Sequence, residues 1–248
     1  MIFPPLKLMT HATKGTFGCA VLSCGAREIP CLAFHTLSTS CVSSCLVLHL
    51  LALQTLQWAY DHRHDGIVFR SDGNSNPSTF YDASFNPDPK DGKSNYGYST
   101  HFFGGPVSWV SKKLRHVGTH VGMNETMAQC FAAKHSTWVH YLLHELDQPP
   151  TTLIDLYGDN DQATQLGQEP MMTTANKYYW PQYYYTKEVH GVTVNCERVP
   201  TEDNDSDLLT KAVDLPTLRK LLPRLTGHIG PFGSDSNFDL STKDYVPV

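Results

Sequence analysis

The chain has 248 residues, of which 40% are hydrophobic and 17% are charged, so it is long enough for one large domain with a buried core. Its formal net charge is −5 and its pI is near 6.2. This balance argues against a protein that holds nucleic acid by bulk positive charge, so any contact with a polyanion must be local. The seven cysteines form no disulfide-framework pattern in a chain of this length.

No part of the sequence predicts a membrane span or a secretory leader. The apolar run at 46–53 is too short to cross a bilayer, and the N-terminus lacks a basic stretch followed by an apolar core and a cleavage site. We therefore expect a soluble intracellular protein of the cytoplasm or nucleus, with its cysteines reduced and with no membrane partner.

The N-terminal part of the chain carries little readable pattern. Residues 1–48 mix Pro, Gly, Ser, Thr and Cys without periodicity, and we assign them no structure. Leucines and Trp58 predict a helix over 49–60. The turn-rich SDGNSNPS at 71–78 indicates a boundary, so the interpretable domain starts near Thr79.

The first half of that domain predicts three strands and a long helix. A strand is expected at 80–85, and the aromatic and β-branched runs at 96–103 and 107–110 flank a Gly-Gly-Pro hairpin signal. A helix is expected over 123–146, with apolar residues near helical spacing on one face. The residues expected on the buried face are Ala128, Phe131, Ala132, Val139, Leu142 and Leu146, and those expected opposite are Lys134, Ser136 and His140.

The second half predicts two further strands and two further helices. Residues 153–157 form a short apolar strand, and a polar helix follows to Leu166. Alternating residues at 192–197 predict a half-buried strand, and a last helix is expected at 215–225. This order of elements fits an α/β fold in which a mixed sheet is flanked by helices.

Four acidic residues stand in different sequence settings: Asp82, Glu125, Asp159 and Asp207. The first three lie at or just past the edge of an expected strand or helix, and they are too far apart to share one helix. Converging carboxylates favour hard divalent cations, two of which can hold a phosphodiester during hydrolysis. The pattern therefore points to a nuclease, although a single Asp in a loop is more often a turn former or a helix cap.

Five stretches of the sequence resemble a known family. They are YDAS at 81–84, GKSNYGYSTHFFGGPVSWVSKK at 92–113, NETMAQCFAAKHSTWVHYLL at 124–143, YGDNDQAT at 157–164 and VPTEDNDSDLLTK at 199–211. Together they resemble the ribonuclease H domain at the C-terminal end of copia-type retrotransposon polyproteins, over residues 79–225. Residues 49–78 look like the connection to the reverse transcriptase in that family, and 226–248 are expected to be a flexible tail. The chain thus resembles a fragment of the larger polyprotein.

The resemblance implies a ribonuclease H-like mixed five-stranded sheet flanked by helices. It also implies an endonuclease that cuts the RNA strand of RNA/DNA hybrids with two Mg²⁺ ions, or with Mn²⁺ as an alternative. The residues that would be catalytic and bind the metal are Asp82, Glu125, Asp159 and Asp207. Two positions depart from the family pattern, because Met123 stands where a second glutamate is frequent and Gly158 where a cysteine is common.

Several basic and aromatic residues have both a binding and a structural interpretation. Lys112, Lys113 and Lys134 are candidates for phosphate contacts or for ordinary solvated charge. The tyrosine-rich run at 178–185 could stack bases, but core packing is the preferred interpretation. The implied partners are an RNA/DNA hybrid and a reverse transcriptase domain.

Three alternatives remain open from the sequence. A zinc site at Cys41, Cys45 and His49 has the spacing of one helical face but lacks a fourth ligand. The chain could instead be an inactive retroelement remnant that binds nucleic acid or has no activity. An integrase or transposase of related fold is disfavoured, because those proteins place glutamate last in the acidic order, whereas here glutamate is second.

Overall fold

The computed structural model describes residues 53, 55–57, 59–60, 66–70, 75–85, 91–168 and 180–228. The chain divides into two units, Met1–Gly66 and Ile67–Val248, and each is described by itself. In the first unit the described residues between 53 and 60 are helical, in agreement with the helix predicted there. Within the described ranges, no helix has the length and apolar character needed to cross a membrane. The predictions for 1–48, the candidate zinc ligands and the tail beyond 228 lie outside the described residues.

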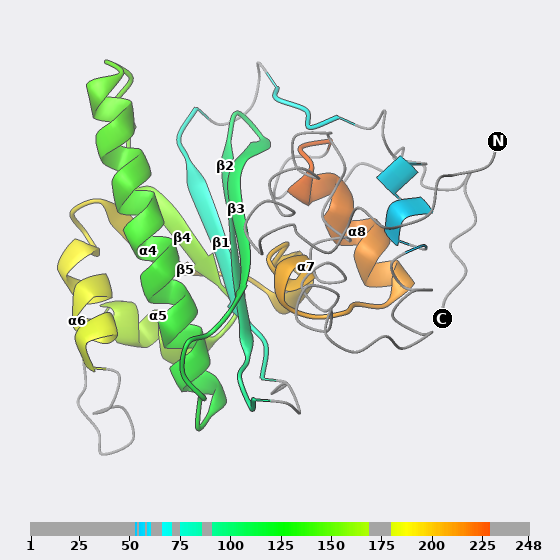
Figure 1. Ribbon diagram of the computed structural model, residues 1–248. Helices are drawn as coiled ribbons and strands as arrows, with labels where there is room; N and C mark the ends of the chain where they lie inside the picture. The colour runs from blue at the N-terminus through cyan, green and yellow to red at the C-terminus, as the bar shows by residue number, and fades with distance from the viewer. Residues whose placement is uncertain are drawn as a thin grey trace, which may run out of the picture. The chain divides into compact units, whose positions relative to one another are not determined.

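A five-stranded mixed sheet forms the centre of the second unit (Figure 1). Its strands are β1 (Ser78–Ala83), β2 (Asn95–Phe102), β3 (Gly105–Lys113), β4 (Ile154–Gly158) and β5 (Val194–Arg198). Their order is β3-β2-β1-β4-β5. The first three strands pair antiparallel, whereas β4 pairs parallel with both β1 and β5. The predicted mixed five-stranded sheet flanked by helices is confirmed.

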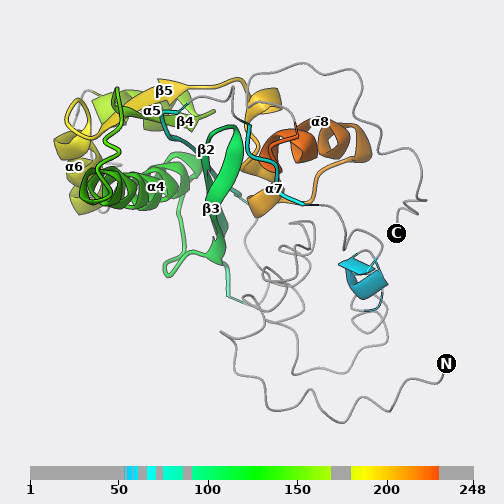
Figure 2. The ribbon, with the colours of Figure 1, turned by 90° about the horizontal axis from the view of Figure 1, so that it is seen from above.

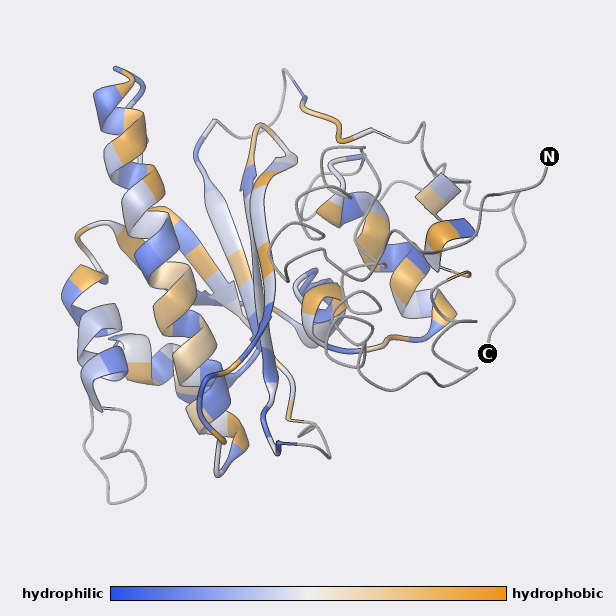
Figure 3. Cartoon of the chain, viewed as in Figure 1, coloured by the Kyte–Doolittle hydropathy of each residue, from blue (hydrophilic) through white to orange (hydrophobic). Residues whose placement is uncertain are grey.

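Helices cover both faces of the sheet. They are α4 (Val121–Glu145), α5 (Asp161–Gln168), α6 (Trp180–Val189), α7 (Asp207–Thr210) and α8 (Leu215–Leu225), with a 3₁₀ turn η2 at Thr201–Asp203. Figures 1 and 2 show α4, α5 and α6 on one face and α7 and α8 on the other. Hydrophobic and hydrophilic residues alternate along α8 (Figure 3), and its leucines at 218, 221, 222 and 225 are buried.

Side chains of β1 alternate between the two faces of the sheet. Tyr81 and Ala83 point towards α4 and share a buried cluster with Ala128 and Ala132 of that helix. The residue between them, Asp82, therefore points to the opposite face, on which α7 lies. This alternation explains how one strand supplies both the core and a buried carboxylate.

The buried face of α4 follows the prediction only in part. Ala132 and Val139 are buried as expected, but Leu146 is 60% exposed, because the last turns of α4 extend past the end of the sheet (Figure 1). Ser136, expected on the solvent side, is fully buried and donates to Thr79 Oγ1 at 2.8 Å. A hydroxyl partner on β1 thus places this serine at the sheet, which hydrophobic periodicity alone cannot predict.

The tyrosine-rich run is helical over its described part. In α6, Tyr183 is buried while Tyr184 is exposed. Core packing, the preferred interpretation of this run, therefore holds for Tyr183. Residues 178 and 179 lie outside the described residues.

Candidate metal centre

Four acidic side chains reach one edge of the sheet from four different elements. Asp82 is near the end of β1, and Asp159 directly follows the last residue of β4. These two strands are parallel neighbours, so their carboxyl ends meet at the same edge, where α/β proteins commonly place their sites. Glu125 lies near the start of α4, and Asp207 is the first residue of α7.

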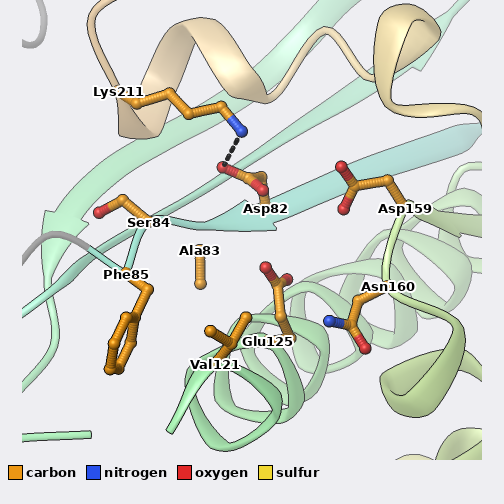
Figure 4. Close-up of a pocket in the computed structure, with 9 residues that line it drawn as sticks. All are labelled: Asp82, Ala83, Ser84, Phe85, Val121, Glu125, Asp159, Asn160 and Lys211. Atoms are coloured by element: carbon orange, nitrogen blue, oxygen red, sulfur yellow. Dashed lines mark ion pairs between the residues drawn. The ribbon is translucent and has the colours of Figure 1, made fainter.

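The four carboxylates converge. Oxygen atoms of Asp82, Asp159 and Asp207 all lie within 4.8 Å of one another. Glu125 lines a pocket together with Asp82 and Asp159, and Figure 4 shows its carboxylate directed towards these two residues. The structure thus brings together all four acids that the sequence singled out.

Non-acidic groups complete the walls of this pocket. Phe85 is half exposed at its rim, and Asn160 caps α5 by accepting a hydrogen bond from the backbone N–H of Ala163 at 3.0 Å. The remaining lining residues are Ala83, Ser84, Val121 and Lys211. The half-exposed Phe85 leaves the pocket open to solvent at its rim, and Lys211 is the one cationic side chain among the described residues that line it.

That cation, Lys211, lies among the carboxylates. Its Nζ is 2.8 Å from Asp207 Oδ1 and 3.8 Å from Asp82 Oδ2, the contact marked in Figure 4. The hydroxyl of Thr210 donates to the same oxygen of Asp82. Sequence reasoning did not single out Lys211, although its position four residues after Asp207 is the spacing of a helical ion pair. One ammonium group cannot neutralise four carboxylates, so the site keeps an excess of negative charge.

Burial and mutual repulsion raise the pKa of three of these acids. Burial raises the pKa of Glu125 well above its ordinary value, and the nearby Asp82 and Asp159 raise it further. Burial also raises the pKa of Asp82, although Lys211 and the Thr210 hydroxyl oppose the shift. For Asp207, burial and the charge of Asp82 raise the pKa to about 7. Without a cation, the folded site therefore retains protons that the same groups would lose in water.

The donor set fits a hard divalent cation. Every candidate ligand atom is a carboxylate oxygen, the donor preferred by Mg²⁺, Mn²⁺ and Ca²⁺. Glu125 Oε2 is buried and accepts no hydrogen bond from any described residue. A buried anionic oxygen without a donor is costly, and a bound cation would satisfy it. Asp82, Asp159 and Asp207, with Glu125 beside them, could bind divalent metal.

We expect the metal-free protein to lose stability as pH rises from about 4 to about 7. The raised pKa values of Asp82, Glu125 and Asp207 mean that the folded state binds more protons than the unfolded chain in this window, so the free energy of unfolding falls with pH. Each unit of pKa difference corresponds to about 1.4 kcal/mol. Urea unfolding in a chelator, at several pH values, measures this slope.

Saturating Mg²⁺ should remove most of this loss at neutral pH, because a ligand that binds only the folded state stabilises it. The matched variant is Asp207→Asn, which cannot ionise and should flatten the pH profile of the metal-free protein. A stability that rises between pH 4 and 7 in the unmodified chain would contradict the proposed repulsion.

The neighbouring acids of Asp207 have other partners. Asp203 pairs with Arg224 Nη1 at 2.6 Å and with Lys220 Nζ at 3.0 Å, both on α8. Asp205 Oδ2 lies 2.8 Å from His101 Nε2 on β2. Of these three acids, Asp207 alone belongs to the cluster with Asp82.

The three lysines considered for nucleic acid lie outside the pocket lining. Lys112 and Lys113 end β3, at the same edge of the sheet as Asp82, and Lys113 Nζ is 3.3 Å from Asp91 Oδ2. Lys134 lies on α4 with its Nζ 5.1 Å from the centre of the Tyr185 ring. Their contact with phosphates stays a prediction, and Lys112, which is exposed at the site's edge, is the best placed.

The departure from the family pattern at Gly158 has a structural cause. A β-carbon at this position would overlap the ring of Tyr81, which is fully buried on the neighbouring strand. Tyr81 Oη accepts a hydrogen bond from Gln129 Nε2 at 3.1 Å, so the ring is held in place. A large residue at 81 thus requires a glycine at 158. The presence of glycine instead of cysteine at this position changes the wall of the site and not its carboxylates.

Comparison with known proteins gives relatives by sequence, whereas no family model matches the chain. The retrovirus-related Pol polyprotein from transposon TNT 1-94 of Nicotiana tabacum is 28% identical over 144 residues, which cover 57% of this chain and 11% of that protein. The Pol polyprotein from transposon RE1 of Arabidopsis thaliana is 27% identical over 165 residues, covering 66% and 11%. The chain therefore spans about a tenth of the length of the curated relatives that it matches.

Solved structures with a similar arrangement include two ribonucleases H1. The enzyme from Halobacterium salinarum NRC-1 aligns with a TM-score of 0.42 and 14% identity, over 54% of this chain and 94% of that chain. LC11-RNase H1, solved in complex with an RNA/DNA hybrid, aligns with a TM-score of 0.41 and 14% identity, over 54% and 93%. The relatives by sequence agree with the resemblance: this chain is similar to a part of retrovirus-related Pol polyproteins of plant transposons.

Proposed function

We propose that this chain is a divalent-metal-dependent endonuclease that cuts the RNA strand of RNA/DNA hybrids as part of a retroelement polyprotein. The observation that carries the proposal is the convergence of three aspartate carboxylates within 4.8 Å, beside a buried glutamate. The relation to retroelement Pol polyproteins supports it. A reverse transcriptase domain is a further proposed partner, because residues 49–78 resemble the connection to one.

Each acid has a proposed role in holding two divalent ions, Mg²⁺ or alternatively Mn²⁺. Asp82, Glu125 and Asp159 would be ligands, and Asp207 would complete the second ion's site and help the product to leave. The chemistry that such ions supply is a lowered pKa for the attacking water and stabilisation of charge on the leaving 3′ oxygen. Lys211 and Thr210 fix the orientation of the carboxyl oxygens to which they bind.

Selectivity for RNA would come from the sugar. Only an RNA strand offers 2′-hydroxyl groups, and proteins distinguish RNA from DNA by contacts with them. Because the net charge is −5, affinity for the hybrid must depend on a few local cations such as Lys112 rather than on the whole surface. We therefore expect weak binding whose decline with salt is shallow, because the slope is set by the few phosphates that these cations contact.

The direct test is a gel assay with the purified chain and a hybrid labelled separately on each strand. We expect cleavage of the RNA strand in Mg²⁺ or Mn²⁺, and none in a chelator. Duplex DNA of the same sequence is the control substrate and should stay intact. Equal cutting of both strands, or cutting that persists in the chelator, would refute the proposed chemistry.

The alternative is a remnant that binds nucleic acid without cutting it. One observation favours it: Lys211 already neutralises part of the carboxylate cluster, so the fold can persist without a bound ion. Binding of the hybrid without cleavage in either metal ion would support this alternative.

A further inference from the structure

Asp207 lies on a short helical segment that is not stable by itself. Helix α7 has four residues, Asp207–Thr210, and helices this short are not stable in isolation. The preceding Ser206 makes no side-chain capping hydrogen bond to it. The placement of Asp207 must therefore come from contacts with the sheet.

One face of β2 is shaped to receive this segment. Gly97 pairs with Asp82 in the sheet register, and a β-carbon at Gly97 would lie 2.6 Å from Leu209 Cβ. The missing side chain thus lets α7 rest directly on the strand. On the adjacent β3, Ser111 Oγ donates to the Leu209 carbonyl at 2.6 Å, which fixes the far end of α7.

Ser99 and His101 follow Gly97 on the same face of β2, and they contact the residues that precede α7. Ser99 Oγ donates to Asp205 Oδ1 at 2.7 Å, and His101 Nε2 lies 2.8 Å from Asp205 Oδ2. All three side chains are buried. We call Ser99, His101 and Asp205 the Asp205 clamp. Ser99 binds one carboxylate oxygen of Asp205, and the His101 ring lies close to the other without a hydrogen bond, so the segment cannot slide along the strand without losing both contacts.

A neighbouring bond ties the same segment to β1. Asn204 Nδ2 donates to the carbonyl of Tyr81 at 2.9 Å, and Tyr81 directly precedes Asp82. The segment is thus anchored to β1 and to its neighbour β2, immediately before Asp207. Apolar burial alone would favour contact with the sheet without selecting one register, whereas directed polar contacts select one.

We propose that the Asp205 clamp is the positioning device that holds Asp207 against Asp82 and Asp159 for divalent-ion binding. This rests on the proposed function. Asp205 acts through Asp207, because its carboxylate is directed to His101 and is not a member of the acidic cluster. Burying a carboxylate is unfavourable unless it is paired, and a buried carboxylate with one hydrogen bond and a neighbouring imidazole fixes this segment in a single geometry.

The test compares Asp205→Asn with Asp203→Asn in the full chain. Asp203 lies two residues earlier on the same segment and pairs with α8, away from the cluster. We expect Asp205→Asn to weaken Mn²⁺ binding, measured by calorimetry, by about 10-fold or more, the loss typical of groups that orient metal ligands. The Mg²⁺ concentration for half-maximal hybrid cleavage should rise in parallel, while the KM for the hybrid stays constant. Asp203→Asn should leave both the Mn²⁺ affinity and the Mg²⁺ concentration for half-maximal cleavage unchanged, whatever its effect on Tm.

Ser99→Ala is the second variant, in case Asp205→Asn does not fold. It removes one contact to Asp205 and should shift the Mn²⁺ affinity in the same direction by a smaller factor. Variants that lower Tm while keeping the Mn²⁺ affinity of the original chain would overturn the clamp. If the original chain binds Mn²⁺ but does not cut hybrids, the proposed nuclease fails, yet the same calorimetric comparison still decides the clamp.

Discussion

Asp82→Asn is expected to abolish metal-dependent cleavage of an RNA/DNA hybrid while leaving the metal-free protein at least as stable as the original. Asp82 is buried at the centre of the cluster, and an amide is a weaker ligand for a hard cation than a carboxylate. Losing several kcal/mol of charge stabilisation in the transition state lowers the rate by roughly 10³-fold or more. Cleavage rates under single-turnover conditions in saturating Mg²⁺ measure this loss.

The expected stability of metal-free Asp82→Asn follows from the raised pKa of Asp82. Because burial disfavours its charged form, replacement by a neutral group of the same shape removes repulsion from the folded state. Lys211 loses one partner but keeps Asp207 Oδ1 at 2.8 Å. Urea unfolding of the metal-free variant should therefore give a free energy of unfolding no lower than that of the original chain.

Asp155→Asn is the matched control for this variant. It makes the same chemical change on the adjacent strand β4, where the Asp155 carboxylate accepts a hydrogen bond from Asn195 Nδ2 at 3.2 Å outside the cluster. Cleavage by this control should stay near that of the original chain. The metal-centre proposal fails if folded Asp82→Asn retains cleavage within about tenfold of the control.

The sequence predicted the elements that carry Asp82 and Asp159, because short apolar strands ending in a carboxylate are readable locally. It did not by itself predict that these strands are adjacent. Strand order is a property of the whole fold, so the placement of the acids at the edges of elements indicated only that they could converge, and the resemblance to a family implied that they bind metal together. The structure supplies the physical reason, since β1 and β4 run parallel side by side and end at one edge.

Positions decided by a distant polar partner were not predictable from the sequence. Asp203 and Asp205 differ from Asp207 only in what they meet after folding, namely Arg224 and His101. Ser136 was placed on the solvent face because it is polar, yet a hydroxyl on β1 binds it. Periodicity ranks residues by hydropathy, so it misassigns a polar side chain whose partner lies elsewhere in the chain.

Gly158→Ala should destabilise the protein by about 1–3 kcal/mol or more, because it overpacks a filled core. The added β-carbon would overlap the ring of Tyr81, and that ring is packed in the cluster with Ala128 and Leu156. Because Asp159 directly follows, the strain should also reduce cleavage. Gly122→Ala is the control, since the atom that it meets is the end of the flexible Gln162 side chain.

A double-mutant cycle separates this clash from other costs of the substitution. Tyr81→Ala alone should cost about 3–5 kcal/mol through the cavity that it leaves. In the double variant the alanine at 158 has room, so the combined loss should be smaller than the sum of the single losses by at least about 1 kcal/mol. Urea unfolding of the four proteins measures the coupling. Additive losses would mean that the Tyr81 ring does not impose the glycine, and that the departure at this position has another origin.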